Sequence, residues 1–320
     1  MNFLFRDAEG EALCPQGSVV CIGAFDGLHL GHQALLHHAH THARQLQLPV
    51  VALSFEPLPR EFFARDTPPG RLMLARDKLQ GFARAGMDGV GLLRFDARMA
   101  AMPAETFVAQ VLQRRLGARA VWVGPEFHFG HQRRGDLALL QAEGEKHHFT
   151  AHAIAPVMYQ GERISSSRIR AVLADGDFAL AAACLGQSYR ISGRVVHGRK
   201  LGRKLGFPTA NLRFTRHPPM QGIYAVRVHG VAATPYAAVA SFGTRPTVAG
   251  DAPLLEVHLF DFSGDLYGQL LEVEFIAKLR DEEKFASLDA LAAQMRQDAL
   301  LARSLLAARR SPDAVENPHE

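Results

Sequence analysis

The stretch VVCIGAFDGLHLGHQALL, residues 19–36, contains an apolar run, a glycine turn and the beginning of a helical pattern. The run before Gly23 is typical of a buried strand, and the helix is expected to begin around Gly31 and His32. Backbone N–H groups at a helix N-terminus attract phosphate, and glycines let the phosphate approach the chain closely. These residues therefore predict the strand, turn and helix of an α/β domain that binds a phosphate-bearing ligand.

The same alternation extends from about residue 18 to residue 160. Short β-branched runs such as PVVALSF and ARAVWVG alternate with longer segments of helical spacing, such as HQALLHHAHTHARQLQ and PAETFVAQVLQRRLG. This pattern is typical of βαβ units on a parallel sheet that is covered on both faces. We therefore predict a doubly wound, Rossmann-like α/β domain over residues 1–184, with its ligand at the carboxyl ends of the strands.

Residues 185–308 show a different pattern, in which strand-like runs such as GIYAVRVHG and PYAAVASFG follow one another without intervening helices. Strands at this close spacing predict an antiparallel barrel or sandwich. A helix is expected to follow Ser287, which is a suitable N-cap, and residues 309–320 are expected to form a flexible tail. The chain is thus predicted to contain an α/β domain, a β domain and a terminal helix.

Composition points to an ordinary folded protein: of 320 residues, 48% are hydrophobic and 21% are charged. No apolar run approaches the roughly 18 residues of a membrane span, and no signal-like apolar core is present at the start. Cys14, Cys21 and Cys184 are far apart in sequence and are expected to be reduced, buried thiols. The net charge of +4 permits anionic ligands. We predict a cytoplasmic protein.

His29 and His32 stand in the pattern H-x-G-H at the expected start of the helix. Both imidazoles are able to donate to phosphate oxygens as negative charge builds up on a leaving pyrophosphate, which stabilises the transition state without nucleophilic catalysis. The segment ISSSRIR, residues 164–170, adds hydroxyls suited to a helix N-cap and the fixed positive charge of its arginines. Together these segments predict a nucleotide site.

The form G-x-F-D-G-x-H-x-G-H-Q resembles the FAD synthetase branch of the H-I-G-H adenylyl-transferring enzymes, and ISSSRIR resembles the second motif of that superfamily, with Ser167 where a Thr often stands. The resemblance implies adenylyl transfer, with His29 and His32 as catalytic residues. It also implies that ATP and its phosphates are bound by Gly23, Phe25, Asp26, Gly27, His29, His32, Arg163, Ser166, Ser167 and Arg170.

Two further segments match that family in part: SFEPLPREFF after the second expected strand, and VWVGPEFHFGHQRRGD after a later one. They imply a flavin site with the residues Phe55, Pro57, Glu126 and Phe127. The family usually has Asp or Asn at the position of Glu126. Phe127 and Phe129 either flank a flat ring or pack the loop, since aromatic faces serve both purposes.

A second phosphate site is predicted in RVVHGRKLGRKLG, where glycines interrupt a run of basic residues. The following GFPTAN offers the Thr209 hydroxyl and the Asn211 amide oxygen, hard ligands that suit Mg²⁺ carrying nucleotide phosphates. We therefore expect an ATP and phosphate site with the residues Gly198, Gly202, Lys204, Thr209 and Asn211, of which Thr209 and Asn211 bind the metal. The G-x-x-x-x-G-K-[ST] motif does not occur, which argues against a P-loop kinase.

The run G-R-x-L-G-F-P-T-A-N-L resembles the riboflavin kinase family, and the resemblance continues through GIY at 222–224 and GTRPTV, where Arg245 replaces an Asn seen in many members. It implies a barrel fold with Glu256 as the catalytic base. Physically, a carboxylate near an alcohol accepts its proton while Mg²⁺ and cations hold the phosphate in line. The segment LRDEEKF then implies a flavin contact from Arg280.

The two resemblances together imply a bifunctional enzyme that uses ATP and Mg²⁺ to convert riboflavin to FMN, and then FMN to FAD with release of pyrophosphate. Its expected partners are these small molecules, with no nucleic acid or membrane, in a monomer or weak oligomer. Two alternatives stay open. One is the same first fold with another acceptor, such as tRNA or phosphopantetheine; the other is a binding module that holds flavin or nucleotide without turnover.

Overall fold

The computed structural model describes residues 1–320 except 65, 199–200, 215–216, 248–249 and 310–320. The chain divides into two compact units, Met1–Ser166 and Ser167–Glu320. Most of the tail expected at 309–320 lies outside the described residues. No helix of the described part is both long and apolar enough to cross a membrane.

The first unit contains a six-stranded sheet with the strand order β1-β4-β3-β2-β5-β6. All of its neighbouring strands pair in parallel. The strands are β1 (Phe3–Phe5), β2 (Ser18–Ile22), β3 (Val50–Glu56), β4 (Gly89–Arg94), β5 (Ala118–Val123) and β6 (Thr150–Ala153). The predicted parallel sheet is therefore confirmed.

Helices cover both faces of this sheet. Side chains alternate in direction along each buried strand, so apolar side chains project from both faces and pack against the helices there. On β2, Val19 and Cys21 pack with α1 (Leu30–Leu46) and α3 (Ala75–Arg84). Val20 and Ile22 belong to the opposite core. That core contains residues of α4 (Ala97–Ala101), α5 (Ala104–Phe107), the π-helix Val108–Arg115 and α6 (Leu137–His147). The unit is thus a doubly wound α/β fold, as the sequence predicts.

Strand order places the switch point of the fold between β2 and β5. The chain runs outward from β2 through β3 to β4, and then returns to the other side of β2 for β5 and β6. Ligands of open α/β sheets bind at such a switch, outside the carboxyl ends of the strands. The loops after β2 and β5 therefore flank the expected binding crevice. Outside the sheet lie α2 (Pro59–Phe63), the 3₁₀ turn His131–Arg133 and the β7 (Met158–Tyr159) and β8 (Glu162–Arg163) hairpin.

The second unit contains a closed barrel with the strand order β10-β13-β12-β11-β14-β9, in which the neighbouring strands pair antiparallel. Its strands are β9 (Arg190–Val196), β10 (Ala210–Arg213), β11 (Gly222–His229), β12 (Tyr236–Thr247), β13 (Gly250–Leu259) and β14 (Leu270–Arg280). Helices α7 (Ser166–Asp175) and α8 (Phe178–Leu185) precede the barrel, and the short α9 (Leu201–Lys204) follows β9. The prediction of an antiparallel barrel is confirmed.

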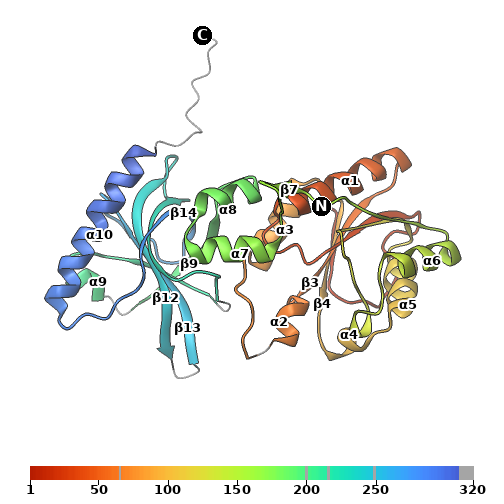
Figure 1. Ribbon diagram of the computed structural model, residues 1–320, viewed down its shortest axis with the longest axis horizontal. Coiled ribbons are helices and arrows are strands. Elements are labelled where there is room, and N and C mark those ends of the chain that lie inside the picture. Colours follow the sequence, from red (N-terminus) through yellow and green to blue (C-terminus); the bar gives the residue numbers. More distant parts are fainter. Residues whose placement is uncertain (65, 199–200, 215–216, 248–249, 310–320) are drawn as a thin grey trace, which may run out of the picture. The chain divides into compact units, whose positions relative to one another are not determined.

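Helix α10 (Leu288–Ala308) lies along the outside of the barrel (Figure 1). Ser287 caps it, since its Oγ accepts from Ala290 N–H at 3.1 Å. Ala302 and Leu306 pack in one apolar cluster with barrel residues such as Ala225. The terminal helix is thus present, with its N-cap at the residue that the sequence indicates.

Candidate functional sites in the two units

The turn after β2 is held in an unusual backbone conformation. Phe25 has φ +49° although it is not glycine, and Gly27 has φ +91°. The carboxylate of Asp26, which is 1% exposed, points into the protein and accepts from the N–H groups of Leu72 and Met73 at 3.2 and 3.1 Å. Asp26 therefore fixes the shape of the turn through its side chain.

His29 and His32 stack at the start of α1, with ring centroids 3.7 Å apart and an interplanar angle of 17°. His29 is the N-cap residue, because its Nδ1 accepts from His32 N–H at 3.3 Å. Burial, together with the nearby His29 and Lys78, holds the pKa of His32 well below its usual value. A neutral imidazole keeps one N–H donor and one acceptor. His32 Nδ1 is buried and has no partner among the described residues.

Ser166, the first residue of α7, contacts the turn after β2, since its Oγ donates to Asp26 O at 2.9 Å. Ser167 and Arg170 follow on α7 in the second unit. Arg163, on β8, donates to Glu126 Oε2 at 2.6 Å and to Pro125 O at 3.4 Å. The loop after β5 is thereby linked to the segment before α7, as expected for two walls of one crevice.

Aromatic rings gather at the carboxyl ends of β3 and β4. Phe95 contacts Phe55, Phe62 and Phe63 with centroid separations of 5.6, 5.5 and 5.8 Å. Phe63 is 70% exposed, so this cluster offers a ring face to solvent. Pro57, also expected at a flavin site, lies two residues after Phe55, and the peptide bond between Glu56 and Pro57 is cis.

Phe127 stacks on Phe129, with centroids 5.3 Å apart. Phe129 is buried and also contacts Phe107, and Phe127 packs against the same apolar core. These contacts favour the packing interpretation of the pair over that of two rings flanking a ligand.

In the second unit, a cavity of about 260 Å³ opens at the side of the barrel. Its wall includes Glu256 on β13, Ser241 on β12 and Thr209 before β10. The sheet register pairs Glu256 with Asn211 on one side and with Ser241 on the other. Directly opposed residues of antiparallel strands project to one face. A carboxylate, an amide and a hydroxyl therefore form a row across three strands.

Asn211 is 6% exposed, and its Oδ1 is buried without a hydrogen-bond partner among the described residues. A buried, unsatisfied amide oxygen is costly unless something binds it. The loop closes tightly here, since a Cβ added to Gly198 would lie 2.6 Å from the Asn211 side chain. A Cβ on Gly202 would similarly lie 2.3 Å from Phe207 O. The side chain of Lys204 lies outside the described residues, as does that of Arg245.

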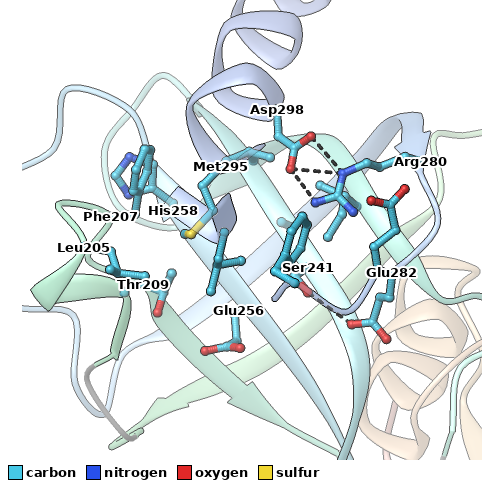
Figure 2. A pocket seen from close by; sticks show the side chains of 17 residues that line it. Leu205, Phe207, Thr209, Ser241, Glu256, His258, Arg280, Glu282, Met295 and Asp298 are labelled. Atoms are coloured by element: carbon cyan, nitrogen blue, oxygen red, sulfur yellow. Dashed lines mark hydrogen bonds and ion pairs between the residues drawn. The ribbon is translucent and has the colours of Figure 1, made fainter. Parts of the chain in front are cut away.

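On the far side of the cavity from Thr209, Arg280 binds Asp298 of α10 through two nitrogens, at 2.9 and 2.7 Å (Figure 2). This pairing raises the pKa of the Arg280 guanidinium, which stays charged. Glu282 lies beside them and accepts from Ser241 Oγ at 3.4 Å. Met295 projects from α10 toward the middle of the cavity. The cavity thus combines a charged end with apolar walls, as ligand pockets generally do.

A second cavity, of about 270 Å³, lies between the strand that ends in Leu259 and the loop Phe262–Tyr267. Arg203 and Tyr267 line it, and Thr209 lines both this cavity and the first. The two hollows therefore have one residue of the GFPTAN segment in common.

Models of two known families match the chain side by side: FAD synthetase over residues 12–168 and riboflavin kinase over residues 185–306. A bifunctional riboflavin kinase/FMN adenylyltransferase of Escherichia coli K12 is 46% identical over 302 residues, which is 94% of this chain and 96% of that protein. The chain belongs to the bifunctional riboflavin kinase/FMN adenylyltransferase family.

Another relative carries the same description, and a solved structure shares the overall fold of the chain. A Haemophilus influenzae protein of the same description is 44% identical and covers 90% of this chain and 94% of its own. A crystal structure described as a macrolide-efflux protein from Streptococcus pneumoniae aligns with a TM-score of 0.78 at 30% identity, over 95% of this chain and 99% of that one. The bifunctional enzyme makes FMN from riboflavin and FAD from FMN, with ATP as the second substrate.

Some contacts near the candidate sites are not indicated by the local sequence. Phe62 and Phe63 stand within the quoted SFEPLPREFF, but nothing local indicates that they meet Phe95 beyond the next strand. His258 Nδ1 lies 2.9 Å from Pro208 O and so fixes the GFPTAN turn. Its position two residues after Glu256 puts it on the same face of β13, a signal that the alternation of strands does provide.

Proposed function

We propose that the two activities are divided along the chain: residues 1–184 transfer the adenylyl group to FMN, and residues 185–308 phosphorylate riboflavin. Support comes from Thr209, which lines both barrel cavities, and from Glu256, which lines the first of them. A phosphoryl transfer needs an alcohol, a base and a nucleotide phosphate to meet at one point. Two cavities that share a wall next to a carboxylate are suited to that meeting.

In the proposed kinase reaction, riboflavin occupies the first cavity and ATP extends from the second toward Thr209. Glu256 accepts the proton of the terminal ribityl hydroxyl as that oxygen attacks the γ-phosphorus and ADP leaves. Arg280, held by Asp298, lies at the flavin end. Gly198 and Gly202 bring the loop backbone close, and we expect Lys204 to contribute charge to the phosphates.

Thr209 and Asn211 fit a Mg²⁺ site, because the buried Oδ1 of Asn211 has no partner among the described residues and is a hard oxygen donor. When bound there, Mg²⁺ would neutralise charge on the nucleotide phosphates. The row Asn211–Glu256–Ser241 then sets where the alcohol lies relative to these oxygens.

For adenylyl transfer, we propose that the phosphates of ATP lie at the turn Gly23–Gly27 and the N-terminus of α1. Neutral His32, together with His29, donates to the oxygens that become pyrophosphate. Further phosphate contacts are proposed for Arg163, Ser166, Ser167 and Arg170. The FMN ring is proposed to stack near Phe55, Phe62, Phe63 and Pro57, with Glu126 and Phe127 at the edge of the crevice.

Replacing Glu256 with Gln tests this division within one molecule. We expect riboflavin phosphorylation to fall roughly 10²- to 10⁴-fold, the usual contribution of a general base. Adenylylation of supplied FMN should stay at the wild-type rate. Glu283→Gln, in the same cavity, is the matched control and should keep both rates within an order of magnitude. Loss of FAD formation from FMN in Glu256→Gln would show that the halves are assigned wrongly.

We also propose that Mg²⁺ accompanies ATP in both reactions, and that the enzyme acts in the cytoplasm as a monomer or weak oligomer on small molecules, without nucleic acid or membrane. The three cysteines are buried and form no disulfide, which supports a reducing compartment. Light scattering of the purified protein at increasing concentration measures the oligomeric state.

A further inference from the structure

A lysine lies buried beneath the turn that follows β2. Lys78, on α3, is 1% exposed, and its Nζ donates to Ala24 O at 2.7 Å and to Ser54 Oγ at 3.2 Å. Ser54 Oγ in turn donates to the same Ala24 oxygen at 3.0 Å. One backbone carbonyl of the turn therefore receives two hydrogen bonds, one of them from an ammonium.

The face of α3 that carries Lys78 also contacts the next residues of the turn. Residues at positions i, i+3 and i+4 share one face of a helix, and here they are Lys78, Gly81 and Phe82. The Phe82 ring meets the edge of Phe25, with centroids 5.0 Å apart. A Cβ on Gly81 would lie 2.1 Å from Leu28 Cδ1, so the Leu28 side chain packs directly against this glycine and would have to shift if a larger residue replaced it.

Both turn residues that α3 contacts have strained backbones, with φ +49° at Phe25 and +44° at Leu28. Bulky residues in this region cost free energy and persist only where surrounding contacts impose the conformation. Asp26, between them, is held by the N–H groups of residues 72 and 73 just before α3. Contacts from the segment 72–82 therefore impose the backbone conformation of residues 24–28.

Burial is the main influence on the ammonium of Lys78, and charged side chains act on it as well. Asp26, Glu56 and Glu61 favour its ammonium, Arg71 opposes it, and burial lowers its pKa to about 8. His32, the catalytic histidine of the proposed adenylyl site, is also close enough to respond to this charge. Burying an ammonium is expensive, so its retention at this position calls for a function.

We propose that Lys78 is a positioning residue for adenylyl transfer: its ammonium fixes the Ala24 carbonyl inward and thereby presents the Phe25 N–H to the phosphates of ATP. In a trans peptide the C=O and N–H point in opposite directions, so fixing one orients the other. A peptide that is free to rotate would point its carbonyl oxygen at the phosphate part of the time, which repels it. This role rests on the proposed assignment of adenylyl transfer to the first half.

Lys78→Met keeps the length of the side chain and removes the charge. We expect kcat for FAD formation from FMN to fall roughly 10- to 100-fold, the size that a small misplacement of a positioning group produces. Riboflavin phosphorylation by the same molecules should be unchanged. Lys146→Met, an exposed lysine of the same unit, is the matched control and should match the wild type in both reactions.

Wild-type kcat for FAD formation in Lys78→Met would overturn the proposal. His32→Ala tests the underlying assignment separately: if it abolishes FAD formation while Lys78→Met does not, the site stands and the role of Lys78 falls. If His32→Ala leaves FAD formation intact, the assignment of the site itself fails.

A second measurement is independent of whether Lys78→Met folds. The pH profile of kcat for FAD formation should have a descending limb where Lys78 loses its proton. Ser54→Ala removes one hydrogen-bond acceptor from the ammonium, so the pKa of Lys78 falls and the limb moves to lower pH. The profile of the kinase reaction should not move. A limb at the same pH in Ser54→Ala and the wild type would contradict the proposal, since a purely structural lysine does not set this limb.

Discussion

The buried Lys78 makes the stability of the first unit depend on pH in a direction unusual for a lysine. Its pKa is lowered from 10.5 to about 8, chiefly by burial. Between these values the unfolded chain binds a proton that the folded chain does not, so the free energy of unfolding rises with pH. Each pKa unit is about 1.36 kcal/mol. Raising the pH from about 7.5 to about 10 should therefore stabilise the wild type by roughly 2 kcal/mol relative to Lys78→Met.

Fluorescence provides the assay, because Trp122 is the single tryptophan of the chain and lies on β5 of the first unit. The gap in melting temperature between wild type and Lys78→Met should change by roughly 4–8 °C over that range, in favour of the wild type at high pH. Lys146→Met is the control. The pKa of Lys146 is raised by Glu143, so any stabilisation from that pair is lost rather than gained as pH rises. Parallel curves for wild type and Lys78→Met would refute the reasoning.

Three further outcomes are expected. Asn211→Ala removes the buried amide oxygen and should raise the Mg²⁺ concentration for half-maximal kinase activity about tenfold or more, with the adenylyl transferase as the internal control. Asp298→Asn weakens the ion pair that positions Arg280, so the KM for riboflavin should rise by about tenfold while kcat changes little. An unchanged KM would contradict the proposed contact between Arg280 and riboflavin. Arg71→Met leaves Glu61, 5% exposed, without its buried partner and should lower the free energy of unfolding by about 3–5 kcal/mol in urea titrations followed by Trp fluorescence; a loss below about 1 kcal/mol would contradict this.

Periodicity predicts the elements of this protein well, because buried strands and amphipathic helices carry their repeat in the sequence. It does not predict the type of helix over Val108–Arg115, which is a π-helix after one turn of α-helix at Ala104–Phe107. The buried positions Val108, Val111 and Leu112 have the same spacing of three and four that an α-helix shows. The spacing of the buried residues therefore does not distinguish the two types of helix.

In the candidate sites, too, some residues are predictable from the local sequence and others are not. His29 and His32 are recognisable because the strand, turn, histidines and helix start follow one another in sequence. Lys78 is not recognisable in this way, because in ARDKLQGFAR it resembles a lysine on a solvated face. Its hydrogen bond is to Ala24, 54 residues away in sequence, so its burial is a matter of tertiary structure. The partners Arg163 and Glu126 are also far apart in sequence, by 37 residues. Local motifs thus indicate the groups proposed to touch substrate, whereas the groups that hold those motifs in shape come from tertiary contacts.

Thr209 gives the two cavities of the barrel a common wall. With riboflavin and nucleotide in these cavities, as proposed, each substrate touches a side chain that the other also touches. Where binding of one substrate changes the affinity for the other, the thermodynamic cycle requires the two effects to be equal. The factor by which nucleotide changes the dissociation constant of riboflavin must equal the factor by which riboflavin changes that of the nucleotide. A substitution at Thr209 that changes one of these factors must therefore change the other equally.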